Sequence, residues 1–84
     1  MDEMMMVKAI SLDAMRAGLA VKGLCQEFAI DKTNFYSWRR GEMRPNAESL
    51  AKLIRMREFI RGVLLLKQKI RDGEIAKTVY PLVP

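Results

Sequence analysis

The longest stretch without a structural break in this sequence is residues 47–71, which contain no proline and a single glycine, Gly62. Because proline and glycine are the residues that most often interrupt a helix, this stretch predicts either one long helix or two shorter ones. Its apolar residues form two stripes: Leu50, Leu53 and Ile54, then Phe59, Val63, Leu66 and Ile70. Either the helix breaks near residues 55–57, or one helix presents one face to a core and another to a partner.

Shorter helices are expected before this stretch. Capping and turn residues predict them over 12–17, 21–29 and 32–40. The expected N-caps are Ser11, Asp31 and Asn46, and the expected helix-ending glycines are Gly18 and Gly41. In the first of these helices, Leu12, Met15 and Leu19 share one face.

Both ends of the chain have the composition of strands. Residues 5–10 are apolar and partly β-branched with no helical period, which predicts an extended segment or short strand, and residues 75–80 have a similar composition. The predicted fold class is therefore all-α, a bundle of four to five helices with a short β-strand allowed at either end.

The chain is expected to form one domain over residues 1–84. Its parts are an N-terminal arm at 1–10, a helical core at 11–55, and a C-terminal helix and tail at 56–84. A domain of this size buries only ~60% of its unfolded surface, so a second copy or another partner would add stability. The start of the chain is acidic, unlike a secretory signal, so a cytoplasmic location is expected. The true start is left open among Met1, Met4, Met5 and Met6.

The residue inventory argues against an enzyme. The chain has no histidine and one cysteine, Cys25, which excludes an internal disulfide and the common zinc ligand sets. Histidine-based acid–base chemistry is also absent, and no nucleophile–base pair or phosphate loop is visible. We therefore expect no cofactor, no metal and no catalytic residue, and we expect Cys25 to lie in the core.

Positive charge is concentrated in the middle of the chain. Residues 32–71 hold eleven Lys and Arg against three Glu, a net charge of +8, whereas residues 1–31 carry −2 and residues 72–84 carry −1. Such a block is typical of a surface that binds a polyanion, although it is equally typical of a solvated surface.

Residues 12–55 resemble the helix-turn-helix of phage repressors and Cro proteins, the lambda-repressor-like family. The matching run is Leu19-x4-Leu24-Cys25-x2-Phe28-Ala29-Ile30-Asp31-x3-Phe35-x2-Trp38-x2-Gly41-x3-Pro45-x4-Leu50-x2-Leu53. The family usually has alanine in place of Cys25 and glycine in place of Ala29. Because a left-handed turn costs alanine more than glycine, the turn at Ala29 is either distorted or shifted by one residue.

This resemblance implies a recognition helix over residues 32–40. With Phe35 and Trp38 facing inward, the opposite face holds the positions that contact bases in the family: Lys32, Thr33, Tyr36, Ser37 and Arg40. The candidates for phosphate contacts are Lys22, Asn34, Arg39 and Arg44.

The expected function is that of a sequence-specific regulator of transcription that binds double-stranded DNA. The family resemblance implies a repressor or Cro-like homodimer at an operator, of the kind found in phages and mobile elements. The candidate dimer interface is Phe59, Val63, Leu66 and Ile70. One alternative stays open: a protein-interaction module, such as an antitoxin or antirepressor that uses residues 59–70. The basic amphipathic segment 57–67 is also typical of a membrane surface, but a place in the core and in a dimer interface is favoured for it, so no membrane partner is expected.

Overall fold

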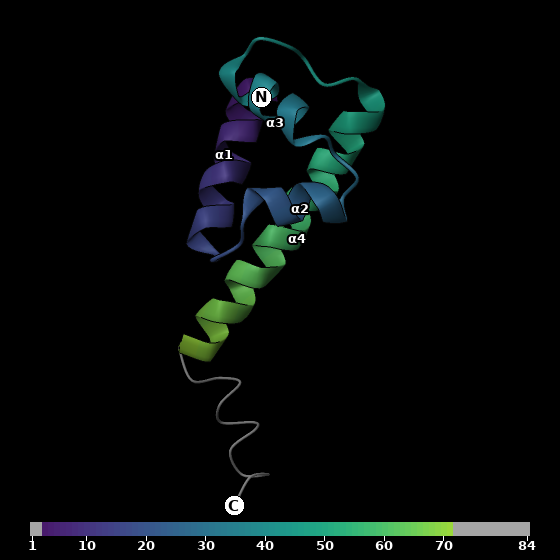
Figure 1. The fold of residues 1–84 in the computed structure, drawn as a ribbon. Coiled ribbons are helices and arrows are strands. Elements are labelled where there is room, and N and C mark those ends of the chain that lie inside the picture. The colour runs from purple at the N-terminus through teal and green to yellow at the C-terminus, as the bar shows by residue number, and fades with distance from the viewer. Residues whose placement is uncertain (1–2, 72–84) are drawn as a thin grey trace, which may run out of the picture.

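The computed structural model describes residues 3–71, which form four helices and no strand (Figure 1). The helices are α1 (Glu3–Arg16), α2 (Val21–Glu27), α3 (Lys32–Arg40) and α4 (Ala47–Arg71). The all-α prediction is confirmed for this part of the chain. The strand-like segment at residues 75–80 lies outside the described residues.

The first helix corrects the prediction for the N-terminal segment. Residues 5–10 are helical, and Ser11 lies inside α1 instead of capping a later helix. The residues that α1 buries recur at helical spacing: Met6, Val7, Ile10 and Ala14. Leu12 and Met15, expected to face inward, are exposed. The packing of this stripe against α3 and α4 outweighs the weak strand preference of the β-branched residues.

Three of the helices end in the same way. After α1, α2 and α3 the chain turns through a left-handed residue, which is Gly18, Ala29 and Gly41 respectively. In each case the next residue donates its backbone N–H to a carbonyl five residues back, at 2.8–2.9 Å. This hydrogen bond satisfies a carbonyl that the helix end would otherwise leave unpaired. The α2–α3 turn is therefore regular, with Ala29 in the left-handed position at φ 56°.

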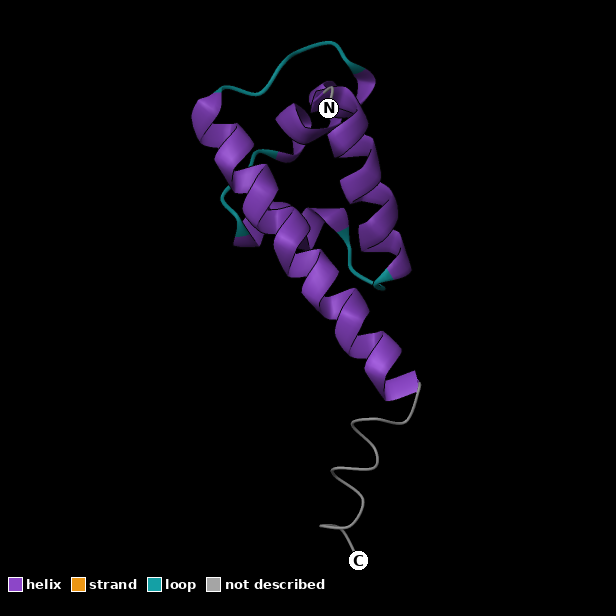
Figure 2. Ribbon diagram, turned by 180° about the vertical axis from the view of Figure 1, so that it is seen from behind, coloured by secondary structure: helices purple, strands orange, loops and turns teal. Residues whose placement is uncertain are grey.

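The long C-terminal segment is one uninterrupted helix of 25 residues (Figure 2). Asn46 caps it, since its side-chain Oδ1 accepts the backbone N–H of Ser49 at 2.8 Å. The face that α4 buries consists of Leu53, Met56 and Ile60. Ile54 was expected beside Leu53 in the core, but it is exposed.

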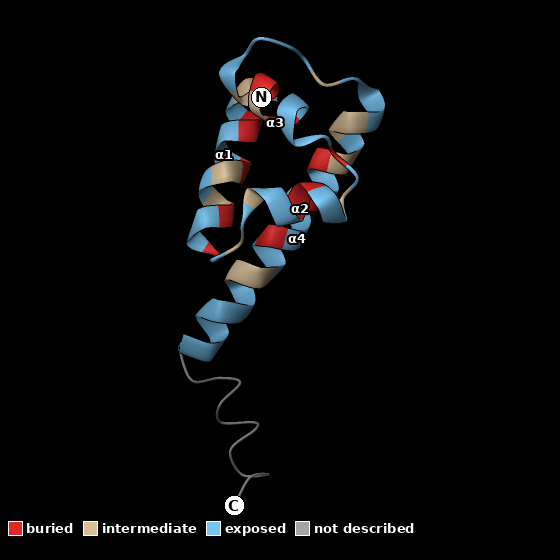
Figure 3. Cartoon of the chain, viewed as in Figure 1, coloured by how far each residue is buried: buried red, intermediate tan, exposed pale blue. Residues whose placement is uncertain are grey.

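The core lies between α1, α3 and the first half of α4, and α2 packs across α3 (Figure 3). Phe35 and Trp38 of α3 are both buried, and Cys25 is also in the core, as expected. Burial raises the pKa of the Cys25 thiol above its ordinary value, and the nearby charge of Asp31 raises it further. No helix between residues 3 and 71 combines the length and apolar character needed to span a membrane.

Candidate nucleic-acid interface

The orientation of α3 is set at both of its ends and from beneath. At the N-terminus, Asp31 Oδ1 accepts the backbone N–H of Thr33 at 2.8 Å, which satisfies a donor that the first turn leaves free. At the C-terminus, Gly41 adopts the left-handed cap. Beneath the helix, Phe35 and Trp38 are buried in the core. These contacts hold the opposite face of α3 toward solvent in a defined direction.

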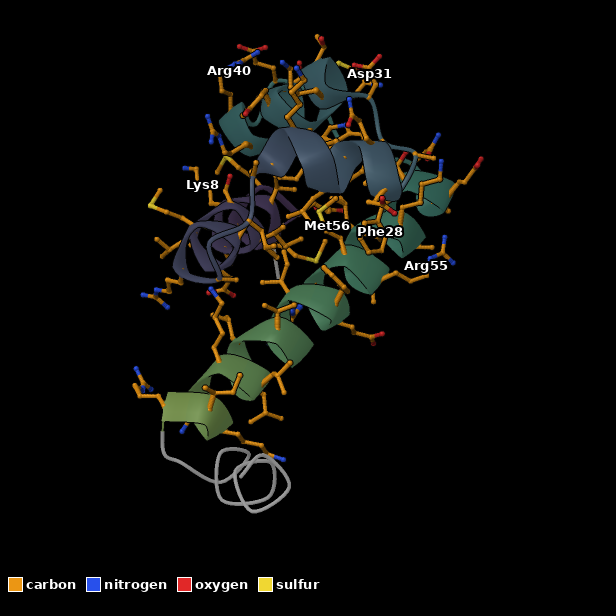
Figure 4. The ribbon with its side chains drawn as sticks, turned by 60° about the horizontal axis from the view of Figure 1, so that its bottom comes forward. Lys8, Phe28, Asp31, Arg40, Arg55 and Met56 are labelled. Carbon is orange, nitrogen blue, oxygen red and sulfur yellow. The ribbon has the colours of Figure 1, made fainter. Side chains whose placement is uncertain are left out.

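That outward face carries three of the five side chains expected to contact bases. Lys32, Thr33 and Arg40 are exposed there, and Asn34, a candidate for a phosphate contact, is exposed at the edge of this face. Arg40 projects from the end of α3 opposite to Asp31, which marks the start of the helix (Figure 4). At a rise of 1.5 Å per residue, Lys32 and Arg40 are separated by about 12 Å along the helix axis, comparable with the width of the B-DNA major groove.

Ser37 does not belong to this exposed set. Its exposed fraction is 8%, so it lies against the body of the domain. The prediction grouped Ser37 with the outward residues because it lies one turn after Thr33. In the folded chain, Ser37 lies next to the buried Trp38 and is covered with it. A buried serine cannot reach a base edge, so the outward face is narrower than predicted.

Tyr36 and Arg39 are tied to each other and to α1. The Arg39 guanidinium lies 4.6 Å from the centroid of the Tyr36 ring, a cation–π contact. Arg39 Nη1 also donates to Ser11 Oγ of α1 at 3.3 Å. The Tyr36 ring in turn meets Phe35 edge to face, with ring centroids 5.9 Å apart. Both side chains are half-buried and serve as a brace between α3 and α1 in this structure.

Arg40 has an acidic partner, Glu42, that the sequence pattern did not predict. Its Nε and Nη2 atoms donate to the two carboxylate oxygens of Glu42, at 2.9 and 3.2 Å. Hydrogen bonding and charge from Arg40 lower the pKa of Glu42, and the same contacts raise the pKa of Arg40. Because a guanidinium uses this same fork to bind guanine or phosphate, Glu42 competes with any such ligand of Arg40.

The other candidates for phosphate contacts lie at the ends of elements. Lys22 is exposed in the first turn of α2, and Asn34 is exposed on α3. Arg44 is exposed in the α3–α4 loop, where it lines a hollow of about 200 Å³ together with Glu3 and Met43. Lys22 precedes α3 in the chain, Asn34 lies on it and Arg44 follows it. Side chains at such positions could contact DNA phosphates and so position the helix on the DNA backbone.

Lys52 of α4 supports the α2–α3 turn and was absent from the predicted residues. Its Nζ donates to the backbone carbonyl of Ala29 at 2.9 Å and lies 3.8 Å from the Glu48 carboxylate. The spacing of Glu48 and Lys52 could have revealed their ion pair, since residues four apart on a helix are neighbours. Nothing in the sequence indicated the link to Ala29, 23 residues away.

The predicted dimer residues separate into two groups. Phe59, Leu66 and Ile70 are exposed, with 49%, 51% and 53% of their surfaces accessible. Val63 is half-buried and packs against the core. Three of the four residues therefore remain available for a partner.

No protein-family model, curated protein sequence or solved structure matches this chain.

Proposed function

We propose that this chain is a sequence-specific regulator of transcription that binds double-stranded DNA through α3. One observation carries the proposal: α3 holds Lys32, Thr33 and Arg40 exposed on one side while its aromatic residues anchor the other side in the core. An α-helix fits the major groove, and these side-chain types make the usual hydrogen bonds to base edges. The net charge of +8 over residues 32–71 supplies attraction to phosphates.

The proposal assigns separate tasks to the cations. Arg40 and Lys32 pair with guanines, and Thr33 serves as a donor or acceptor at neighbouring bases. Lys22, Asn34 and Arg44 contact the phosphate backbone and fix the register of α3 in the groove. The role is one of binding and not of catalysis, and it places the protein in the cytoplasm with the DNA that it regulates.

The regulator acts as a homodimer of the repressor or Cro type, of the kind used by phages and mobile elements. Its exposed residues Phe59, Leu66 and Ile70 support this part of the proposal, because apolar side chains of this size are costly to leave in water. Two copies would present two α3 helices to a two-fold symmetric operator.

DNA binding is tested by footprinting and fluorescence anisotropy on the region upstream of the protein's own gene. Thr33→Ala and Arg40→Ala should each weaken binding about 5- to 150-fold and relax the sequence preference, since one good base contact contributes about 1–3 kcal/mol. The matched control is Arg55→Ala. Arg55 is exposed on α4 and points away from α3 (Figure 4), so its loss should weaken binding to all sequences slightly and equally. Equal, weak binding of every sequence by all four proteins would refute the proposal.

A protein-interaction module is the second candidate, as an antitoxin or antirepressor that binds another protein. The exposed apolar face of α4 favours it. The two candidates differ in salt dependence. Operator affinity that depends on sequence and falls steeply between 50 and 200 mM salt supports the regulator. A chain that binds no DNA at low salt supports the module.

A further inference from the structure

The second half of α4 extends past the ends of the other three helices (Figures 1 and 2). On one face of this half, Phe59, Val63, Leu66 and Ile70 follow one another at steps of four, three and four residues. This spacing has a period of 3.5 residues, which is the pattern of a seam between two packed helices. The core of the monomer uses the neighbouring face of α4, which carries Met56 and Ile60, and Val63 lies at the border of the two faces, half-buried against the core.

A shallow apolar groove lies beside this seam, between α2 and α4. Its volume is about 320 Å³, and its lining residues are Leu19, Ala20, Gly23, Leu24, Gln26, Glu27 and Phe59. Phe59 forms one wall and is held there by Phe28, whose ring centroid lies 5.9 Å away. The body of the domain therefore offers a groove next to the point where the seam begins.

Two glycines in this region have open space around them among residues 3–71. A Cβ atom added to Gly23 or Gly62 would meet no atom within 4 Å, and neither residue has a positive φ. A glycine inside a helix costs roughly 0.5–1 kcal/mol relative to alanine, so each is a local weakness. Gly23 lines the groove, and Gly62 lies one turn from both Phe59 and Leu66. Both positions would allow a second backbone to approach closely.

We propose that the groove and the extending half of α4 are two parts of one two-fold interface, in which the α4 helices of two copies pack antiparallel. The inference rests on the homodimer of the proposed function and specifies its geometry. Phe59 of each copy meets Ile70 of the other, and Val63 meets Leu66. The extending half of each helix then covers the groove of the other copy, so each surface is matched by its symmetry mate.

Charge favours the antiparallel over the parallel arrangement. The last two turns of α4 carry Lys67, Lys69 and Arg71, and no acidic residue lies between Phe59 and Arg71. Parallel packing would bring these cations against the same cations of the second copy. Antiparallel packing separates the two sets of cations and brings the end of α4 that carries them toward the groove, where Glu27 lies on the rim. Opposite charges facing one another specify the orientation of such an interface.

The geometry also gives a spacing for the two recognition helices. The hydrogen bond from Lys52 Nζ to the Ala29 carbonyl places the α2–α3 turn within reach of the residue 52 side chain of α4. The two-fold axis passes between Val63 and Leu66, about 12 residues further along. At 1.5 Å per residue, the two Lys52 positions that hold the α2–α3 turns are about 37 Å apart along the α4 axis. This separation is close to one turn of B-DNA, the distance between operator half-sites.

A matched pair of substitutions tests the seam. Leu65 and Leu66 are adjacent leucines with exposed fractions of 54% and 51%, but they point in directions about 100° apart. Sedimentation equilibrium of Leu66→Glu should show a dimer dissociation constant raised about 100-fold, whereas Leu65→Glu should match the unmodified chain. Gly23→Trp should also dissociate the dimer because its indole fills the groove. Circular dichroism should show unchanged helix content in all three variants.

Cross-linking tests the orientation. In a Cys25→Ala background, a mixture of Phe59→Cys and Ile70→Cys chains should form a disulfide between the two variants. Ile70→Cys alone should form none, because the two Ile70 positions lie at opposite ends of the interface. A disulfide between two Ile70→Cys chains would overturn the antiparallel arrangement.

Two results would overturn the seam. One is an equal rise in the dimer dissociation constant for Leu65→Glu and Leu66→Glu, and the other is a full chain that stays monomeric at high concentration. If that monomer dimerises once residues 72–84 are removed, the groove belongs to that segment. A dimer with the expected cross-link that fails to bind DNA would refute the proposed regulator and leave the interface intact. Operator binding by a monomer would refute the interface alone.

Discussion

Ala29 holds a backbone conformation that glycine adopts more readily than any other residue. Its φ of 56° is the only positive value among non-glycine residues of the described chain, 3–71. In this region the Cβ atom crowds the following carbonyl, which costs alanine about 1–2 kcal/mol. The turn keeps its form because Ile30 N–H bonds back to Cys25 and Lys52 binds the Ala29 carbonyl. Tertiary contacts therefore stabilise a turn that the residue itself disfavours.

Ala29→Gly should stabilise the fold by about 1 kcal/mol, because it removes the crowding at the left-handed position. Thermal unfolding monitored by circular dichroism should show a rise in Tm of about 4–8 °C. The matched control is Ala51→Gly, at an exposed position inside α4, which should lower stability by about 1 kcal/mol. A lower Tm for Ala29→Gly would show that the turn does not strain alanine.

Glu42 controls how freely Arg40 can bind another acceptor. Glu42→Gln should raise DNA affinity several-fold at 50 mM salt, because it frees the Arg40 guanidinium for a guanine and removes a negative charge beside the DNA. Glu58→Gln, at an exposed position on α4, removes the same charge away from Arg40 and should change affinity much less. Anisotropy titrations at several salt concentrations measure both effects. Equal gains for the two variants would mean that only net charge matters.

The pH dependence of this competition follows from the lowered pKa of Glu42. A carboxyl whose pKa is lowered by folding contributes its interaction above the ordinary glutamate value. That contribution is lost as the pH falls through the lower, folded value. The ion pair with Arg40 is therefore complete at neutral pH. The advantage of Glu42→Gln over the unmodified chain should shrink only in acid.

At the scale of elements, the helix ends are specified locally and the buried faces are not. Asp31, Asn46 and Gly41 cap the helices where the sequence predicted, because each acts on backbone groups within a few residues. The faces of α1 and α4 were predicted less well. A helix can bury any of several apolar stripes, and contact with other helices decides among them.

The caps of α3 and α4 should contribute comparably to stability. Asp31→Ala and Asn46→Ala each remove a 2.8 Å hydrogen bond to an otherwise unpaired N–H and should cost about 1 kcal/mol. Urea unfolding measures the change, and the conservative Asp31→Asn should retain most of the stability because asparagine also caps. If Asp31→Asn were as damaging as Asp31→Ala, charge and not the cap would be the cause.

The whole molecule depends on a small core in which α4 is the central element. Met56 is fully buried, and it lies between Leu53 and Ile60 on the face of α4 that meets α1. In a domain of 84 residues such positions are few, so the loss of one is a large share of the total stability. The presentation of α3 depends on this core, because α3 packs on α1.

Met56→Ala should lower stability by about 2–5 kcal/mol, through lost burial and the cavity that remains. The exposed Met15 provides the control, since Met15→Ala should change stability by less than about 0.5 kcal/mol. Urea unfolding of both variants gives the comparison. Met56→Ala should also lose operator binding near its lowered Tm, whereas its affinity well below that temperature should be normal.

The sequence by itself determined the features that depend on neighbouring residues. These are the all-α class, the caps at Asp31 and Asn46, the turns at Gly18 and Gly41, and the inward direction of Phe35 and Trp38. Periodicity and turn chemistry act within one or two helical turns, so they are visible without a fold.

Only the tertiary structure decided which distant surfaces meet. It made residues 5–10 part of α1, because their stripe packs on α3 and α4. It buried Ser37, tied Arg39 to Ser11, and left Phe59, Leu66 and Ile70 exposed on an unbroken α4. Each of these outcomes depends on the distance between residues far apart in the chain, which packing sets and local preference does not.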